Sequence, residues 1–135
     1  MAKVIGLGGV FIKFKDPKAM RLWYEEALGM KTNAYGVLFE FNRPDAKRGF
    51  LQLGTFEAES TYFGAATQQV MLNFRVDDLT SFEKELRDKG IRIVDTLESY
   101  DFGKFLHIED PEGNRIELWE PAKDEASDET SMPLA

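Results

Sequence analysis

The chain has no cysteine and a single histidine among its 135 residues. The missing cysteine excludes disulfides, thiolate metal sites and a cysteine nucleophile. Long hydrophobic runs are also absent, so no segment has the length of a membrane-spanning helix. The N-terminal segment, MAKVIGLGGVFIKF, has no long apolar stretch followed by a small-residue cleavage site. We therefore expect a cytoplasmic protein with no membrane partner.

Basic residues are in the minority, with 17 Lys and Arg against 24 Asp and Glu, for a net charge of -7. This balance argues against a nucleic-acid partner, because phosphate binding needs clustered Lys and Arg. The content of 43% hydrophobic and 30% charged residues is typical of a globular protein. A chain of this length suits one compact domain, or two small modules that share a core.

The first half of the chain predicts one strand, one helix and three further strands. Residues 4–14 are rich in β-branched and aromatic residues, and Asp16 followed by Pro17 is typical of a helix start. Apolar residues at helical spacing continue to Gly29, a typical helix end, and predict that Trp23 belongs to the core. The predicted strands after this helix are 30–33, 37–41 and 49–53.

Residues 54–68 carry Gly, Ala, Ser and Thr with little periodicity, which predicts a linker. A flap over a binding site is the alternative, since the segment also contains Phe56, Tyr62 and Phe63.

After this linker the same order of elements starts again. The strand 70–76 is followed by a helix that begins at Asp78 and ends at Gly90, and by the strands 91–97, 104–109 and 115–120. The pattern is an internal repeat of about 60 residues. We therefore predict one domain, 1–121, built from two βαβββ modules at about 4–54 and 69–121. Residues 122–135 are acidic, small and polar, which predicts a disordered tail.

Three segments point to a known family: DPKAMRLWYEEALGM at 16–30, VDDLTSFEKELRDKGIRI at 76–93 and DPEGNRIELWEP at 110–121. In these segments, their order and their separation, the chain resembles the vicinal-oxygen-chelate superfamily of glyoxalases, bleomycin-resistance proteins and dioxygenases over residues 4–121. The resemblance implies an α+β fold in which paired βαβββ modules form a curved mixed sheet, shaped as a cup for a small-molecule ligand. It also implies a homodimer, and leaves open whether the modules pair within one chain or between two.

Family members with metal chemistry carry four His, Gln or Glu ligands on the first and last strands of the two modules. The resemblance maps these positions onto Gly9, Gln52, Met71 and Glu117. Only Glu117 is a strong ligand for a divalent metal, because Gly9 has no side chain and Met71 offers a soft thioether. We therefore expect no metal cofactor. That expectation argues against glyoxalase I and extradiol dioxygenase activity, since both use the metal to organise substrate oxygens.

Strand periodicity extends the inward-facing set from these positions, because alternate residues of a strand share one face. The resemblance implies that His107, on the preceding strand, also lines the cup. Glu117 and His107 are therefore the candidate catalytic residues, with Glu117 as a general base or ligand anchor. The alternative is a structural carboxylate held by Lys13, Gln52 or Arg115. A largely apolar lining with a few polar groups is typical of a small-molecule site. The candidate ligand-binding residues are Phe11, Lys13, Phe50, Gln52, Met71, Asn73 and Trp119.

Three functions follow from this lining. The favoured one is a metal-free small-molecule binding protein of the glyoxalase and bleomycin-resistance type, which stacks its ligand between aromatic side chains. The second is an enzyme that uses Glu117 and His107: a lyase or isomerase similar to lactoylglutathione lyase, or a dioxygenase-related enzyme. The third is a non-catalytic dimeric assembly module whose cup is closed by its own side chains.

Overall fold

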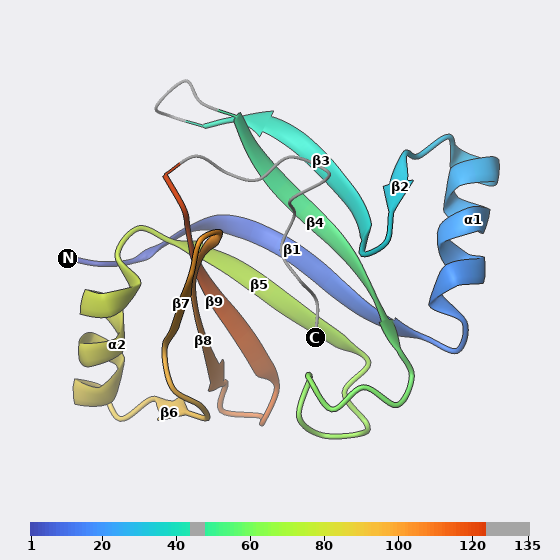
Figure 1. Ribbon diagram of the computed structural model, residues 1–135. Coiled ribbons are helices and arrows are strands. Elements are labelled where there is room, and N and C mark those ends of the chain that lie inside the picture. The colour runs from blue at the N-terminus through green and yellow to red at the C-terminus, as the bar shows by residue number, and fades with distance from the viewer. Residues whose placement is uncertain (44–47, 124–135) are drawn as a thin grey trace.

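A computed structural model describes residues 1–43 and 48–123 of the chain, and the predicted tail lies outside the described residues from 124 onward. The described residues form two helices and one mixed sheet of nine strands (Figure 1). The predicted α+β class is therefore confirmed. The sheet is curved and open, so it forms a trough and not a closed barrel.

The first module contains the elements β1 (Val4–Phe14), α1 (Pro17–Leu28), β2 (Thr32–Asn33), β3 (Gly36–Asn42) and β4 (Arg48–Glu57). The helix begins as the sequence predicts, because the Asp16 carboxylate accepts a hydrogen bond from the backbone N–H of Ala19 at 3.0 Å. It ends at Gly29, whose φ of 71° is the left-handed conformation that favours glycine.

The second module contains β5 (Val70–Val76), α2 (Leu79–Asp88), β6 (Arg92–Ile93), β7 (Glu98–Tyr100), β8 (Gly103–Glu109) and β9 (Arg115–Pro121). Asp78 caps α2 in the same way, accepting from the backbone N–H of Ser81 at 3.2 Å. The turn between β8 and β9 is built on Asp110, whose carboxylate accepts from the backbone N–H groups of Glu112 and Asn114.

The strand order is β2-β3-β4-β1-β5-β9-β8-β6, with β7 paired to β8. In each module the first strand runs parallel to the last, as β1 with β4 and β5 with β9. The first strands of the two modules then pair with each other, because β1 and β5 are antiparallel neighbours. Both modules of one chain thus share one sheet, and the two helices lie at its opposite ends (Figure 1).

Two predicted boundaries and one predicted core residue are wrong. Residues 54–57 belong to β4 and not to the linker, because β4 pairs with β1 as far as Glu57. The predicted strand 91–97 consists only of β6, since Asp95 turns away to bond with β8. Trp23 is 51% exposed and lies outside the core, because only one side of α1 faces its module's sheet.

The buried apolar side chains form two clusters on opposite faces of the sheet. The outer cluster lies beneath α2 and contains Val76, Leu79, Leu86, Leu106 and Leu118. The inner cluster, on the concave face, is mainly aromatic and contains Phe11, Phe56, Phe63, Met71, Phe105 and Trp119. Neighbouring residues of β9, Leu118 and Trp119, enter different clusters because side chains alternate along a strand. The concave face is therefore a second buried surface.

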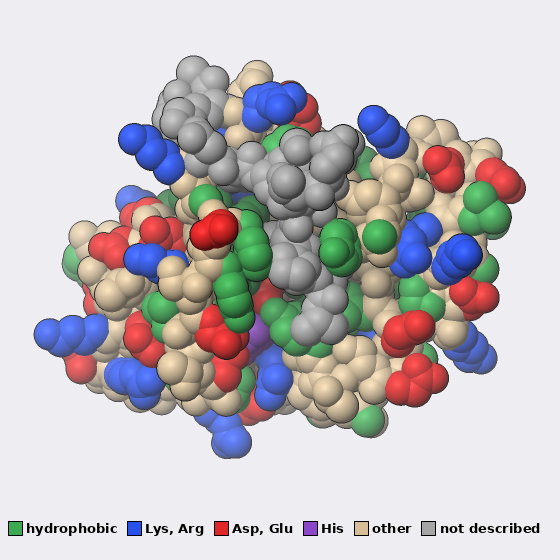
Figure 2. Space-filling view, viewed as in Figure 1, with side chains coloured by type: hydrophobic (Ala, Val, Ile, Leu, Met, Phe, Trp, Pro, Cys, Tyr) green, Lys and Arg blue, Asp and Glu red, His purple; other side chains and the backbone are tan. Residues whose placement is uncertain are grey.

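The outer surface mixes both signs of charge, and Figure 2 shows acidic and basic side chains interspersed over the visible face of both modules. Among the described residues, no helix is both long and apolar enough to cross a membrane.

Candidate functional site

One row of residues crosses the concave face through five neighbouring strands. Gly9 of β1 pairs with Gln52 on β4 and with Asn73 on β5, Asn73 pairs with Glu117 on β9, and Glu117 pairs with His107 on β8. We call these five residues the central row. Strand pairing therefore brings a carboxylate, an imidazole and two amides, far apart in sequence, onto one line.

The strand register adds one residue to the positions that the family resemblance maps, because Asn73, on the same face of β5 as the mapped Met71, lies in the central row. In the first module Gly9 pairs with Gln52, and in the second module the equivalent pair is Asn73 with Glu117. Met71 pairs with Phe11 instead and belongs to the aromatic cluster. Met71 and Asn73 are two residues apart and share one face of the strand, so periodicity alone cannot distinguish them.

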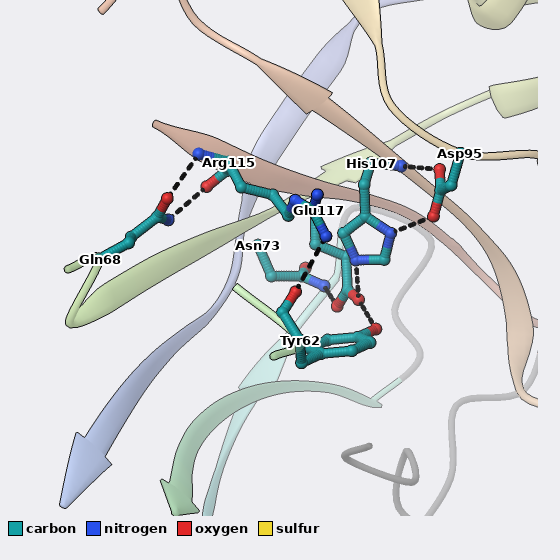
Figure 3. A network of polar contacts seen from close by, with 7 residues as sticks. All are labelled: Tyr62, Gln68, Asn73, Asp95, His107, Arg115 and Glu117. Carbon is teal, nitrogen blue, oxygen red and sulfur yellow. Dashed lines mark hydrogen bonds and ion pairs between the residues drawn. The ribbon is translucent and has the colours of Figure 1, made fainter. Parts of the chain in front are cut away.

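Glu117 is the centre of a buried polar network, shown in Figure 3. Its side chain is almost completely buried, with 1% relative exposure. Asn73 Nδ2 donates to Glu117 Oε1 at 2.6 Å, and His107 Nε2 lies 2.9 Å from Oε2. The Tyr62 hydroxyl also donates to Oε2. Three donors offset the cost of burying the carboxylate, which would otherwise be several kcal/mol.

Asp95 holds His107 from the other side of the ring. Its Oδ2 lies 2.6 Å from His107 Nδ1, and its Oδ1 accepts from the backbone N–H of His107 at 2.8 Å. The backbone N–H of Val94 also donates to the carbonyl of His107, at 3.0 Å. The short segment after β6 therefore fixes both the position and the ring orientation of His107.

The charges in this network follow from its hydrogen bonds. Burial by itself lowers the pKa of His107, but hydrogen bonds to Asp95 and Glu117 and the charges of both carboxylates raise it to about 9. At neutral pH, His107 is therefore an imidazolium with two N–H donors. Burial also opposes ionisation of Asp95, yet the hydrogen bonds from His107 lower its pKa. Burial and the Glu117 carboxylate raise the pKa of Tyr62, which keeps the phenol protonated as a donor.

Tyr62 belongs to the crossover, residues 58–69, that joins the two modules. Gln68 anchors this segment, because its side-chain amide donates to the Arg115 carbonyl at 2.9 Å and accepts from the Arg115 backbone N–H at 2.8 Å. The Arg115 guanidinium in turn donates to the Tyr62 carbonyl at 3.4 Å. The Tyr62 ring stacks on Phe56 at 5.7 Å and meets the His107 ring edge-on at 5.0 Å. The crossover is thus packed into the concave face.

A β-bulge in β1 brings the backbone close to this network. Leu7 pairs with Phe74 and Gly9 with Asn73, so Gly8 is the extra residue opposite β5. A Cβ atom at Gly8 would overlap with Asn73 Oδ1. Glycine at this position therefore leaves room for the Asn73 amide that bonds Glu117.

The structure buries every predicted site residue on the sheet. Glu117, His107 and Asn73 meet in the network, and Gln52 lies in the same row. Phe50 lies apart from them, where its backbone carbonyl accepts from Arg75. The remaining predicted residues belong to the aromatic cluster or its border: Phe11, Lys13, Met71 and Trp119.

Two residues of the network were not among the predicted catalytic or binding residues. Tyr62 was noted only within the alternative flap, and the aromatic content of that segment was its one signal. Asp95 gave no signal, because it lies in a segment predicted to be a strand. The predicted structural partners of Glu117 are wrong as well: Asn73, His107 and Tyr62 bond the carboxylate, in place of Lys13, Gln52 or Arg115.

The residues present do not fit the four-ligand metal site that the family resemblance implies. The four mapped positions are Gly9, Gln52, Met71 and Glu117, and Asn73 lies beside Glu117 in the central row. Met71 offers only a soft thioether. Gly9 has no donor atom, and the amides of Gln52 and Asn73 are weak neutral ligands. Both oxygens of the Glu117 carboxylate are already engaged by hydrogen bonds.

The Glyoxalase/Bleomycin resistance protein/Dioxygenase superfamily model matches residues 6–118. The chain belongs to this superfamily. The resemblance noted in the sequence is thus confirmed, and the arrangement of βαβββ modules in one sheet matches the fold of this superfamily. No curated protein is similar enough to the chain to count as a match.

Solved structures of the superfamily share the fold at low sequence identity. A methylmalonyl-CoA epimerase from Mycobacterium tuberculosis is 27% identical, with a TM-score of 0.60 over 88% of this chain and 89% of that one. A Streptomyces coelicolor methylmalonyl-CoA epimerase in complex with 2-nitronate-propionyl-CoA is 18% identical, with a TM-score of 0.67 over 93% and 100%. A glyoxalase/bleomycin resistance protein/dioxygenase superfamily member from Vibrio splendidus 12B01 is 14% identical, with a TM-score of 0.53 over 89% and 99%.

Proposed function

We propose that this protein is an isomerase-type or lyase-type enzyme that moves a proton at a carbon atom next to a carbonyl group. The observation that supports this proposal is the Glu117 carboxylate, which is 1% exposed on the concave face and lies beside the charged ring of His107. Buried titratable groups with perturbed pKa values are typical of acid–base catalysts. Such a site fits the catalytic roles expected for Glu117 and His107 from the sequence.

In this proposal Glu117 acts as the general base. A carboxylate offers about four acceptor positions, of which the hydrogen bonds from Asn73, His107 and Tyr62 take three. In the proposed step, a free lone pair takes the proton from the substrate carbon, and the C–H electrons move to the carbonyl oxygen to form an enolate.

His107 and Asp95 have the supporting role. The imidazolium carries the positive charge that stabilises a nearby enolate, and Asp95 holds that charge in place through Nδ1. The Glu117 carboxyl then returns its proton to carbon, so the reaction is balanced without an oxidant or reductant. We propose that the step needs no metal, since the donor set at the central row suits hydrogen bonding and not metal coordination.

Hydrogen exchange with solvent tests this proposal directly. Methylmalonyl-CoA, which is bound by a similar solved structure, and a panel of 2-oxo acids are incubated with the protein in deuterium oxide. We expect deuterium to enter the acidic C–H position of at least one compound, and Glu117→Gln to slow this exchange by at least about 100-fold with an unchanged fold. Glu112→Gln, an exposed turn residue with the same charge change, is the control. Exchange in Glu117→Gln at the wild-type rate would contradict the proposed base.

A second candidate is metal-free sequestration of a small aromatic molecule, which the aromatic lining of the concave face favours. A binding protein would show a rise in melting temperature with aromatic ligands and no exchange with any of them. If neither deuterium exchange nor a ligand response is found, the remaining candidate is a non-catalytic assembly module whose cup is closed by its own side chains.

We also propose that the protein is a cytoplasmic homodimer whose copies meet through the outer face of β1 and β5. Leu7 on β1 and Val70 and Leu72 on β5 are exposed there, although large apolar side chains on neighbouring strands usually find a partner. Leu72, which is 39% exposed, points away from the cup because its neighbours Met71 and Asn73 are buried. Sedimentation analysis tests the proposal: we expect a dimer, and a shift toward monomer in Leu72→Lys.

A further inference from the structure

Among residues 1–43 and 48–123, three buried polar atoms in the central row and at the border of the aromatic cluster have no hydrogen-bond partner. They are the ammonium of Lys13 and the side-chain oxygens of Gln52 and Asn73. Buried polar groups in folded proteins nearly always have partners, and each exception calls for an explanation. All three atoms belong to the concave face of neighbouring strands, so one bound molecule could satisfy all of them.

Lys13 is the costliest of the three. Its side chain is 6% exposed, and no carboxylate of the described residues forms an ion pair with it. Its ammonium lies 5.1 Å from the centre of the Phe63 ring, which supplies a cation–π contact but no hydrogen-bond acceptor. A buried ammonium with three unused N–H donors destabilises the folded protein unless an anion binds it.

The surroundings of Lys13 define the shape of such an anion. Lys13 pairs in register with Phe56 and follows Phe11 on the same face of β1, so the ammonium is at the border of the aromatic cluster. The central row crosses β1 at Gly9, four residues before Lys13 and therefore roughly 13 Å back along the strand at about 3.3 Å per residue. A ligand that extends from Lys13 to the central row would hold its anionic group at Lys13 and its apolar body on the aromatic rings. Its other end would lie near Glu117.

We propose that Lys13 is the binding site for the carboxylate of an organic acid with an apolar or aromatic body, and that the free oxygens of Gln52 and Asn73 accept hydrogen bonds from N–H or O–H groups of the same ligand. This inference rests on the proposed small-molecule site and names its ligand class. Tyr62 and Phe63 of the crossover occupy part of the volume, so ligand entry displaces these rings.

Matched acids and amides test the proposal. The probes are phenylacetate, 3-phenylpropionate and 4-phenylbutyrate, each compared with its neutral amide by calorimetric titration. We expect at least one acid to bind with saturation and at least about tenfold more tightly than its amide, because a charge-assisted hydrogen bond to Lys13 is lost in the amide. Lys13→Met should remove this preference and leave the affinity for the amide unchanged.

The same variant separates a ligand site from a structural lysine. We expect Lys13→Met to keep or raise the melting temperature of the ligand-free protein, because it removes an unpaired buried charge while retaining an unbranched side chain. Lys84→Met, an exposed residue of α2 with the same charge change, should alter neither binding nor melting. A lower melting temperature in Lys13→Met, equal affinity for acid and amide, or no saturable binding of any acid would each overturn the proposal.

The outcome is independent of the proposed catalysis, because binding is measured without turnover. Acid binding through Lys13 without deuterium exchange would refute the enzyme and retain the ligand class. Deuterium exchange that depends on Glu117, together with no effect of Lys13→Met on acid binding, would retain the enzyme and refute the ligand class.

Discussion

Raising the pH from about 6 to about 9 titrates His107, and we expect the protein to lose stability over this interval. The pKa of His107 is raised from 6.5 to about 9 by the carboxylates of Asp95 and Glu117, although burial alone would lower it. A group whose pKa is higher in the folded state stabilises that state fully below its unfolded pKa. The contribution is therefore complete below pH 6.5 and is lost as the pH rises through about 9.

The magnitude follows from the two pKa values. A tenfold change in proton affinity corresponds to about 1.4 kcal/mol, so the free energy of unfolding should fall by about 3 kcal/mol across the interval. This is a large part of the stability of a small domain, which is about 5–15 kcal/mol. The side chain of His107 is 8% exposed, so solvent screening reduces the effect little.

Two assays follow this titration. The chain has one histidine, so its ring proton resonance in an NMR titration reports the pKa of His107 without assignment. Urea unfolding at the two ends of the interval then reports the loss of stability. Asp95→Asn removes the carboxylate that accepts from Nδ1, and we expect a lower pKa for His107 and a weaker pH dependence.

The reasoning would be refuted by a His107 pKa near 6.5 in the folded protein, or by stability that is flat or rises between these pH values. A steep fall that persists unchanged in His107→Gln would show that another group carries the pH dependence.

Two further predictions concern the packing around Glu117. Gly8→Ala should destabilise the protein by about 1–3 kcal/mol, because a Cβ atom at this position overlaps with Asn73. The control is Gly6→Ala on the same strand, which should be nearly neutral because its Cβ atom meets nothing closer than 3.8 Å. Equal free energies of unfolding in urea for the two variants would show that the bulge tolerates a side chain. Tyr62→Phe should cost about 1.5–3 kcal/mol by removing a hydrogen bond to the Glu117 carboxylate while keeping the ring stack. Tyr24→Phe is its control, and a similar loss in both variants would refute a special role for the Tyr62 hydroxyl.

Much of the fold could be predicted from the sequence because its signals are local. Asp16 with Pro17 and Asp78 mark helix starts, since a cap bonds a backbone group only a few residues away. The family resemblance mapped Glu117 to the inward face, alternation along β9 added Trp119, and both residues are buried. The repeated order of strands and helix indicated two modules, because each unit has the same pattern of apolar faces to bury.

The positions that failed depend on contacts between distant segments. Trp23 has the helical spacing of a core residue, yet its exposure depends on how much of α1 the sheet covers. Which of the two inward-facing residues Met71 and Asn73 stands beside Glu117 was also not predicted, because the register between β1, β5 and β9 is set by strand pairing and by the Gly8 bulge. Neither the extent to which the sheet covers α1 nor the register of the strands can be read from the local sequence.

The sequence by itself determined the two-module α+β architecture, the inward-facing strand positions and the pair of candidate catalytic residues. Only the tertiary structure decided how Glu117 is held. The crossover carries Tyr62 onto the carboxylate, and the segment after β6 folds Asp95 against His107. The physical reason is that a buried charge is stabilised by whichever donors surround it in space. Those donors come from three separate segments, the crossover, β5 and β8, whose meeting depends on the packing of the whole sheet.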